Sequence, residues 1–358
     1  MLDKLGWNGY FAAAWNSVNE PESRPCRVIS QSHEIWRVAG EFGEGIAHMS
    51  GVVRQDAEQG GLWPAVGDWL AVSGAPGDTM RINGIVPRRT QIARKVAGRR
   101  IDTQVLAANV DVAFIVMGMD GDYSARRIER YLSLVWESGA KPVVVLNKAD
   151  LRGDVVRRVE EMEQISHGSP VMAVSALTGE GLSQLEGFLS PGTTIVLLGS
   201  SGAGKSSLTN RLLGMDQQTV FEVRASDSRG RHTTTSRELI LVPGGGVLID
   251  TPGLRELQLW DSERAVKEVF ADLEEFAESC RFRDCSHQGE PDCGVAEAIV
   301  QGWLDAGRLE NYRKLNRERE FLQRKIDPEA RARAKASIKI VSRTVKRLYN
   351  DRERKGKL

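Results

Sequence analysis

Apolar stretches alternate with helix-compatible segments across the middle of the chain. Six apolar runs are predicted strands, at residues 112–117, 143–146, 171–174, 195–198, 239–242 and 247–249. Predicted helices separate most of them, including 128–137 and 155–165. Buried strands that alternate with helices are typical of a doubly wound, largely parallel sheet. Only Pro-Gly-Gly-Gly at 243–246 separates the last two runs, so we expect them to pair as an antiparallel hairpin at one edge. We place this α/β domain at residues 109–258.

The pattern before this domain is different. In residues 25–90, short apolar stretches are broken by glycine-rich turns, which predicts a small, all-β, antiparallel barrel. The stretches lie at 27–30, 35–38, 70–72 and 81–85. Trp36, Trp63 and Trp69 can fill the barrel core or stack on bases, and aromatic residues in small barrels are more often core. Residues 1–24 are expected to form a loose helix or arm that leads into the barrel.

Basic residues gather in two segments outside these domains. Residues 88–100 contain arginine and lysine but no acidic residue, and we assign a basic linker to residues 91–108. This linker can contact RNA or be a plain connector. Residues 331–358 carry eleven Lys and Arg against two acidic residues, a charge of +9, so the remaining chain sums to −8. A basic tail on an acidic body favours a polyanion such as RNA, and a solvated tail without a partner is the alternative.

The composition narrows the class of protein. The 358 residues suffice for two or three domains, and no apolar run approaches the ~18–20 residues of a membrane span. The N-terminus lacks the basic and apolar segments of a secretory signal, and four cysteines are too few for a disulfide scaffold. We therefore expect a cytoplasmic monomer that does not contact membranes.

The predicted strand at 195–198 runs directly into a phosphate-binding motif. The pattern Gly-x-x-x-x-Gly-Lys-Ser is formed by Gly199, Ser200, Ser201, Gly202, Ala203, Gly204, Lys205 and Ser206, and a helix-compatible segment starts at Ser207. Backbone N–H groups of such a loop surround phosphate oxygens, so residues 199–207 are expected to contact a nucleotide. Lys205 should reach the β- and γ-phosphates, and Ser206 should ligate Mg²⁺. The alternative is a chance glycine- and serine-rich loop, which the preceding strand disfavours.

A second phosphate-site motif follows the predicted strand that ends at residue 249. Asp250 and Gly253 form the pattern Asp-x-x-Gly. The Asp250 carboxylate can hold the Mg²⁺ shell through water, and the Gly253 amide can turn toward a γ-phosphate. The pattern alone is weak because it also describes many turns. Its position after a strand, 44 residues beyond Ser206, supports the phosphate-site interpretation.

A base-binding motif follows the predicted strand at 143–146. Asn147, Lys148, Ala149 and Asp150 form the pattern Asn-Lys-x-Asp. A carboxylate at Asp150 can accept hydrogen bonds from N1–H and N2–H₂ of guanine, and adenine offers neither donor there. Ser175 and Ala176 follow the next predicted strand and can present a backbone N–H to guanine O6. The motif alone could be a surface loop, but together with the phosphate loop it predicts a GTPase.

The order of these motifs is inverted. Ras-like GTPases place the phosphate loop first and the guanine motif later, whereas residues 147–150 here precede residues 199–206. No second Asn-Lys-x-Asp follows residue 253. The same sheet must therefore be built from a circularly permuted chain. The permutation puts the 250–253 switch directly before the C-terminal segment, on which its movement could act.

A cysteine and histidine cluster interrupts the helical segment after residue 260. Cys280, Cys285, His287 and Cys293 supply three thiolates and one imidazole within 14 residues. This donor set suits a closed, tetrahedral and therefore structural Zn²⁺ site. Free thiols near a chance histidine are the alternative. Cys26 lies far away in the sequence and is interpreted as a small residue of the barrel core.

These elements together resemble the ribosome small-subunit-dependent GTPases (RsgA) of bacteria, over about residues 25–320. The resemblance rests on residues 147–150, 199–206, 230–235, 250–253 and 280–293, and on a barrel motif at 64–69. It implies an OB-fold barrel at 25–90, a circularly permuted P-loop GTPase domain at 109–258, and a helical zinc-binding domain at 259–330. It also implies late maturation of the small ribosomal subunit coupled to GTP hydrolysis, with the subunit and its rRNA, GTP or GDP, Mg²⁺ and Zn²⁺ as partners. The basic tail is assigned to 331–358.

Catalytic roles are expected in the first switch. Thr234, or a neighbour among residues 233–235, should complete the Mg²⁺ shell. Residue 254 is leucine where Ras-like enzymes place a glutamine that orients water, so the enzyme should be slow alone and stimulated by the small subunit. His232 is the best internal candidate to help the water, and an exposed histidine without a role is the alternative.

Two other functions are considered. An RNA-binding scaffold that holds nucleotide only structurally is disfavoured by the intact Lys205, Ser206 and Asp250. A signalling or translation-factor GTPase without a role in assembly is disfavoured by the cysteine cluster, the permuted order and the barrel. The most informative test is GTP turnover with and without isolated small subunits.

Overall fold

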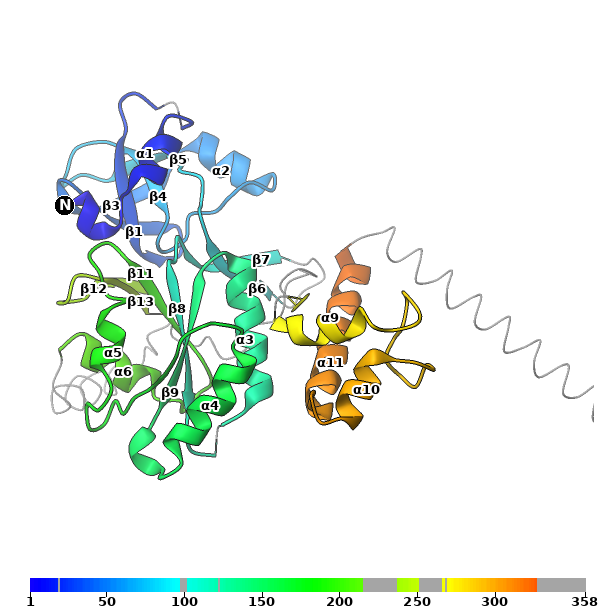
Figure 1. Ribbon diagram of the computed structural model, residues 1–358. Helices are drawn as coiled ribbons and strands as arrows, with labels where there is room; N and C mark the ends of the chain where they lie inside the picture. The colour runs from blue at the N-terminus through cyan, green and yellow to red at the C-terminus, as the bar shows by residue number, and fades with distance from the viewer. Residues whose placement is uncertain are drawn as a thin grey trace, which may run out of the picture. The chain divides into compact units, whose positions relative to one another are not determined.

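The computed structural model of the chain shows two compact units (Figure 1). One unit comprises residues 1–96 and 102–258, and the other comprises 97–101 and 259–358. The structure describes residues 1–18, 20–96, 102–121, 123–214, 237–250, 266–267 and 269–326. None of the helices in these ranges is long and apolar enough to cross a membrane.

The N-terminal segment packs onto the barrel. It forms a short 3-10 helix, η1 (Leu2–Leu5), and the helix α1 (Gly9–Trp15), whose first turn is capped by Asn8. The ring of Trp7 lies edge-on to the ring of Trp69, with centroids 4.8 Å apart, and Phe11 is buried. The sequence predicted a loose helix or arm here. Aromatic contacts with the barrel make it part of the core instead.

Five strands close a barrel. The elements are β1 (Arg24–Ser32), β2 (Ile35–Gly40), β3 (Gly43–Met49), α2 (Gly51–Glu58), β4 (Trp69–Ser73) and β5 (Met80–Ile85). The strands pair in the order β1-β2-β3-β5-β4 and close through β4 with β1. The β3–β5 pair is parallel, which corrects the prediction of an antiparallel barrel, because α2 and β4 lie between these two strands in the chain. Closure of five strands with a helix between β3 and β4 is the arrangement of an OB-fold, as predicted.

Burial in the barrel shows which tryptophans are core residues, and the barrel contains two elements that the sequence did not predict. Trp36 and Trp69 are fully buried, so they are core residues, whereas Trp63 is 43% exposed. Cys26 is fully buried, as predicted. Strand β3 was not predicted, because it contains glycines in place of apolar residues, and α2 was not predicted either. One of them, Gly45, lies where a Cβ would be 2.3 Å from a methyl carbon of Met80 on β5.

The second half of this unit is a mainly parallel sheet with helices. Its elements are β8 (Val112–Gly118), α3 (Ala125–Ser138), β9 (Lys141–Asn147), η2 (Ala149–Leu151), α4 (Val155–Ile165), β10 (Val171–Ala173), α5 (Ser183–Glu186), β11 (Thr194–Leu198), α6 (Lys205–Leu212), β12 (Glu238–Leu241) and β13 (Val247–Asp250). The strand order is β10-β9-β8-β11-β13-β12, and every neighbouring pair is parallel except β12 with β13. Helices α3 and α4 pack along β8 to β10 (Figure 1). The predicted strands and the doubly wound class are confirmed.

The hairpin of β12 and β13 joins the two halves of the unit. It is antiparallel, as predicted, but β12 is not a free edge. Ser30 of β1 pairs with Glu238 of β12, and this makes one continuous sheet of barrel and α/β strands. Arg37 of β2 adds an ion pair with Glu238 (3.0 Å) across this junction, and it also pairs with Glu44 (2.8 Å) on the neighbouring barrel strand β3.

The segment predicted as a basic linker is a hairpin. Strands β6 (Gln91–Val96) and β7 (Asp102–Ala108) pair antiparallel, with Gln91 opposite Ala108. Buried Ile92, Leu106 and Ala107 hold its base, which the many basic residues obscured in the sequence. Arg88, just before the hairpin, is buried at 6% side-chain exposure and paired with Asp68 at 2.7 Å. This arginine of the basic run is therefore structural and does not face a nucleic acid.

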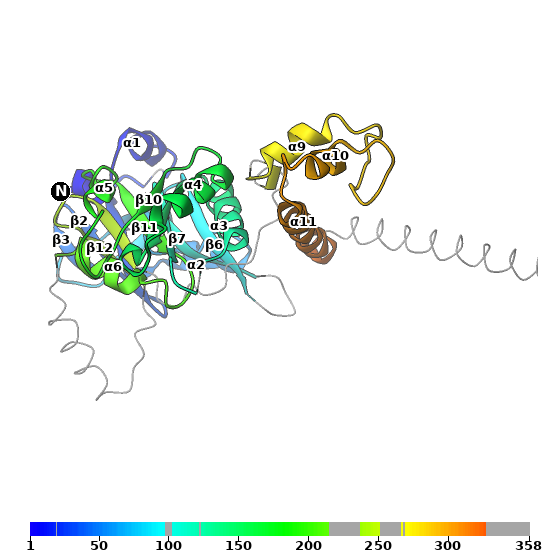
Figure 2. The ribbon, with the colours of Figure 1, turned by 60° about the horizontal axis from the view of Figure 1, so that its bottom comes forward.

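The second unit is helical. In the described range it contains α9 (Ala271–Ala277), α10 (Gly294–Val300) and α11 (Ala306–Ile326), which lie close together (Figure 2), and the cysteine segment connects α9 to α10. Leu273, Val295 and Leu315 are buried between them. Arg308 of α11 holds α9 through Asp272, with N–O distances of 2.7 and 2.8 Å. The helical character predicted after residue 260 is confirmed for the described residues 266–267 and 269–326.

Candidate functional site

The phosphate-loop motif forms a tight turn between β11 and α6. Gly199 adopts φ 143°, and a Cβ there would lie 2.1 Å from the carbonyl oxygen of Val116 on β8. Gly204 adopts φ 91° at the start of α6, and a Cβ there would lie 2.1 Å from Asn147 Nδ2. Both positions therefore require glycine. The Lys205 ammonium folds back over the loop and donates to the carbonyls of Gly199 (2.7 Å) and Ser200 (2.6 Å).

The Asn147 side chain connects the phosphate loop to the Ser175–Ala176 turn, and Asn147 itself begins the Asn-Lys-Ala-Asp loop. It ends β9 and is only 2% exposed. Its Nδ2 donates to the Ala203 carbonyl at 2.9 Å, and its Oδ1 accepts from the Ala176 N–H at 3.0 Å. Motifs that stand in inverted order along the chain are thus adjacent in space, as the permuted arrangement requires.

The Asp150 carboxylate is held in place at the rim of this site. Asp150 lies in η2 and is exposed, and its Oδ1 accepts a hydrogen bond from Ser175 Oγ at 2.5 Å. The Ser175 hydroxyl also accepts from the Thr178 N–H at 3.1 Å. A carboxylate fixed on one oxygen keeps its remaining lone pairs free for two N–H donors of a ligand.

Lys148 has a partner that sequence reasoning missed. The residue adopts a left-handed conformation, φ 66°, and its ammonium pairs with Asp120 Oδ2 at 2.5 Å. Asp120 follows β8, the strand beside β9. Its position at the carboxyl end of a parallel strand was the one available signal, because ligands of doubly wound sheets bind at that edge.

Arg211 is a second residue that the sequence analysis missed. It lies in the last turn of α6, and its guanidinium donates to the carbonyls of Ala176 (2.9 Å) and Leu177 (2.6 Å). No sequence motif marked it.

The remaining predicted site residues form two groups: those that the structure describes and those outside the described residues. Ser206 and Ser207 are exposed in the first turn of α6, and Asp250 is exposed at the end of β13, next to β11. Strands β8, β9, β11 and β13 run parallel, so their carboxyl ends bring these groups to one edge of the sheet. His232, Thr234 and Gly253 lie outside the described residues, and their roles stay predictions.

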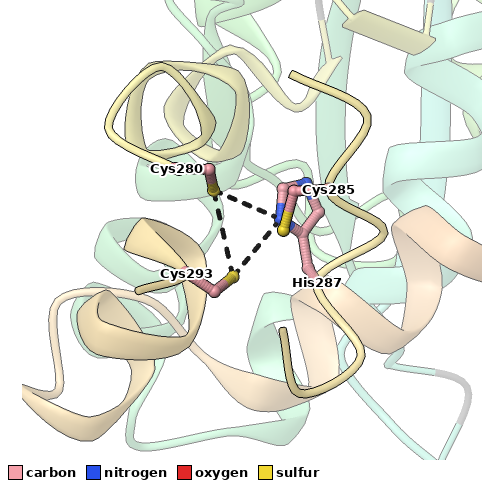
Figure 3. Close-up of side chains that lie close together, drawn as sticks. All are labelled: Cys280, Cys285, His287 and Cys293. Carbon is pink, nitrogen blue, oxygen red and sulfur yellow. Dashed lines mark hydrogen bonds between the residues drawn. The ribbon is translucent and has the colours of Figure 1, made fainter. Parts of the chain in front are cut away.

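The cysteine cluster is assembled in the second unit (Figure 3). The ligand atoms of Cys280, Cys285, His287 and Cys293 all lie within 4.8 Å of one another. His287 Nδ1 is 3.6 Å from Cys280 Sγ and 3.5 Å from Cys293 Sγ, and these two sulfurs are 3.9 Å apart. Zn–S bonds of about 2.3 Å place the corners of a tetrahedron about 3.8 Å apart, so the four residues fit one Zn²⁺.

The surroundings of the cluster suit metal ligands. Burial lowers the pKa of the His287 imidazole, which favours the neutral form that binds metals. His287 adopts φ 57°, and its carbonyl accepts from the Arg313 guanidinium on α11. Cys293 caps α10, where its sulfur accepts from the Ala296 N–H at 3.4 Å. Partial positive charge at a helix N-terminus favours a thiolate.

Fold and site together define a class of protein. A doubly wound sheet with a phosphate loop after β11, and an Asn-Lys-Ala-Asp loop from an earlier part of the chain, is a circularly permuted P-loop GTPase fold, here preceded by an OB-fold barrel. The family model described as RsgA GTPase matches residues 85–260. The chain belongs to the RsgA GTPase family.

Individual relatives support this membership over nearly the whole chain. A protein of Syntrophotalea carbinolica named small ribosomal subunit biogenesis GTPase RsgA is 43% identical over 354 residues, 97% of each chain. One of the same name from Streptomyces coelicolor is 49% identical over 342 residues, 94% of this chain and 92% of that one. Among solved structures, YjeQ from Thermotoga maritima matches with TM-score 0.61 and 29% identity, covering 83% of this chain and 98% of that chain.

Proposed function

We propose that this protein is a GTP hydrolase that binds the small ribosomal subunit and its rRNA, and that hydrolysis drives late maturation of the subunit and release of the enzyme. The observation that carries the proposal is the Asn147 side chain, which bonds the phosphate loop and the Ser175–Ala176 turn at once. The names of relatives that cover nearly all of the chain supply the ribosomal partner. Such a protein acts in the cytoplasm, as a monomer.

The base site is proposed to select guanine. The free lone pairs of Asp150 accept from N1–H and N2–H₂, while the Ser175 hydroxyl keeps the carboxylate in place at 2.5 Å. The aliphatic stem of Lys148 covers the base, and its ion pair with Asp120 limits the positions available to that stem. Adenine would leave the Asp150 carboxylate without its two donors, which is costly in a site built on paired hydrogen bonds.

The phosphate site is proposed to work through Lys205 and Ser206. The Lys205 ammonium exchanges the carbonyls of Gly199 and Ser200 for the β- and γ-phosphate oxygens. The Ser206 hydroxyl and the Asp250 carboxylate are the hard oxygen donors that Mg²⁺ prefers, and both are exposed at the same edge of the sheet. Bound Mg²⁺ would neutralise charge that develops on the phosphates. Thr234 is proposed as a further ligand, and Gly253 as an amide donor to the γ-phosphate.

Hydrolysis by the free protein is proposed to be slow. Residue 254 is leucine, which cannot polarise the attacking water, and His232 is the proposed substitute. The small subunit is proposed to supply the remaining rate, by placing His232 or a group of its own beside the water. The four residues of the cysteine cluster are proposed to hold a structural Zn²⁺, which supplies stability to the second unit and takes no part in hydrolysis.

The test is GTP turnover with Mg²⁺, measured with and without purified small subunits. We expect stimulation by small subunits and none by equal amounts of large subunits. A Lys205→Ala variant controls for contaminating GTPases, because it should lose turnover under both conditions. Equal turnover with either subunit would contradict the proposed partner, and failure to bind GDP in preference to ADP would contradict the guanine site.

A further inference from the structure

The contacts of Arg211 point to a role in base selectivity. We propose that Arg211 is a positioning residue: it holds the carbonyls of Ala176 and Leu177 and thereby aims the Leu177 N–H at O6 of the base. This inference rests on the proposed guanine site. It adds a residue outside the recognised motifs and a donor other than the expected Ala176 N–H.

The guanidinium of Arg211 makes a two-point contact. Its Nε donates to the Ala176 carbonyl at 2.9 Å, and one terminal nitrogen donates to the Leu177 carbonyl at 2.6 Å. A planar fork that binds two successive carbonyls fixes the orientation of both peptide planes, which a single-point contact does not. Since Arg211 belongs to α6, the loop is fastened to the helix that follows the phosphate loop.

The hydrogen bonds of this loop leave one backbone donor for a ligand. The Ala176 N–H donates to Asn147 Oδ1 at 3.0 Å, and the Thr178 N–H donates to Ser175 Oγ at 3.1 Å. Between them, the Leu177 N–H has no hydrogen-bond partner among the described residues. The Ala176 N–H, which was expected to donate to O6, is already bonded to Asn147. The Leu177 N–H is therefore the alternative donor to O6.

The geometry of the peptide unit gives the free donor its direction. The Ala176 C=O and the Leu177 N–H belong to one planar trans peptide and point in opposite directions. Because Arg211 binds the oxygen, the N–H points away from the guanidinium. In guanine, O6 is adjacent to N1–H, which Asp150 is proposed to read. Ser175 contacts Asp150 directly at 2.5 Å, so a donor two residues further along the same turn is well placed for O6.

The test separates recognition of O6 from general stability. Dissociation constants are measured with Mg²⁺ for GDP, for 6-thio-GDP, in which sulfur replaces O6 as a weaker acceptor, and for IDP, which lacks the 2-amino group. In the wild type we expect 6-thio-GDP to bind about tenfold more weakly than GDP, the value of roughly one hydrogen bond. In Arg211→Leu, GDP should weaken about tenfold and the preference over 6-thio-GDP should largely disappear. The preference for GDP over IDP, which depends on Asp150, should remain.

Two further variants make the result interpretable. Arg211→Lys keeps the positive charge but cannot hold both carbonyls with a planar fork, so it should recover only part of the 6-thio discrimination. Arg157→Leu removes an arginine that is 77% exposed and paired on its own helix with Glu161, and it should leave all three affinities unchanged. Should Arg211→Leu fail to fold, Arg211→Lys carries the same comparison.

The possible results distinguish a failure of the role assigned to Arg211 from a failure of the proposed guanine site. Equal weakening of all three nucleotides in the Arg211 variants would show that the residue only stabilises the loop, and would overturn the inference. Unchanged affinities would overturn it as well. A wild-type protein that binds ADP as tightly as GDP would instead refute the guanine site itself.

Discussion

Single side chains set the geometry of the nucleotide site. Asn147 is buried and uses its donor and its acceptor for two different loops, so neither loop can shift without breaking a bond inside the protein. Breaking such a bond leaves a buried polar group unsatisfied, at a cost of about 1–3 kcal/mol. Asp150, in contrast, is exposed, and within the described residues its carboxylate is held by Ser175. Asn147 therefore supports the architecture of the site, and the exposed Asp150 is the residue proposed to select the base.

Asp150→Asn should exchange the base preference. The new amide presents a donor where the carboxylate was an acceptor, and the C2 carbonyl of xanthine matches that donor. We expect the affinity for GDP to fall at least tenfold and the affinity for XDP to rise. The reason is that each mismatched or restored hydrogen-bond pair with the base changes the binding free energy by about 1–3 kcal/mol. Titration calorimetry with both nucleotides measures the exchange. Retention of full GDP affinity would show that Asp150 does not read the base.

Loss of one cysteine ligand should affect the second unit and not the nucleotide site. In Cys285→Ser we expect loss of the proposed Zn²⁺, because a hydroxyl is a far poorer ligand than a thiolate. We also expect a lower melting temperature of the helical unit. GDP affinity should remain within about twofold, since no cluster residue belongs to the unit that carries the phosphate loop.

Metal analysis of the purified protein and its variants checks this prediction. Cys26→Ser serves as the control, because that thiol is buried in the barrel and is not part of the cluster. Wild-type protein purified without chelators that contains no zinc would contradict the assignment.

At the scale of elements, one buried arginine connects four segments of the first unit. Arg27 of β1 is 1% exposed and donates to the Leu5 carbonyl, the Gly67 carbonyl (3.2 Å), the Asn109 carbonyl (3.3 Å) and Thr194 Oγ1 (2.8 Å). Thr194 begins β11, the strand that leads into the phosphate loop. Burial lowers the pKa of the Arg27 guanidinium, as expected when a cation leaves water. Its hydrogen bonds offset that cost.

Arg27→Met should therefore destabilise the first unit. Methionine fills a similar volume but leaves buried carbonyls without donors, so we expect the free energy of unfolding to fall by about 2–4 kcal/mol. Arg37→Met is the matched control. Arg37 pairs with Glu238 across the β1–β12 junction and with Glu44 on β3, but its side chain is 47% exposed, and such pairs contribute about 0–1 kcal/mol. Urea unfolding of both variants measures the difference, and equal destabilisation would refute the role assigned to Arg27.

At the scale of the whole molecule, the permuted order determines which segment follows the nucleotide site. Asp250 ends β13, and the chain after it leads into the helical second unit. In an unpermuted GTPase the same strand would be followed by the remaining strands of the sheet. Nucleotide-dependent changes after Asp250 can therefore act on the second unit through a direct chain connection. This predicts that affinity for small subunits depends on the bound nucleotide.

Deletion of residues 331–358 should separate two effects on the affinity for small subunits, that of the charge of the tail and that of the bound nucleotide. The segment carries +9, so its contacts with rRNA phosphates should weaken as salt rises, by a slope of about −0.7 to −0.9 per neutralised phosphate. Co-sedimentation with small subunits across a salt series should show a flatter slope for the truncated protein. The preference for GTP over GDP should persist in it, because the proposed switch lies outside the tail. An unchanged slope would leave the tail without a role in binding.

The sequence by itself determined the family of this protein and the residues of its candidate sites. The phosphate loop, the Asn-Lys-Ala-Asp loop and the cysteine cluster are local patterns whose function requires fixed residue types at fixed spacing, so they can be read without a fold. The apolar runs also located β8 to β13 correctly, most clearly for β8, β9 and β11, because strands buried on both faces leave a continuous signal.

Only the tertiary structure decided the contacts between distant segments. Arg27 meets Thr194, Asp120 meets Lys148, and Arg211 meets Ala176, pairs that are 167, 28 and 35 residues apart. Hydrophobic periodicity reports whether a position faces a core, but not which segment lies opposite it. The basic residues around β6 and β7 gave the composition of a linker, and strand pairing together with burial of Arg88 made that region part of the fold. Polar side chains are buried where a partner exists, and the partner is set by the path of the whole chain.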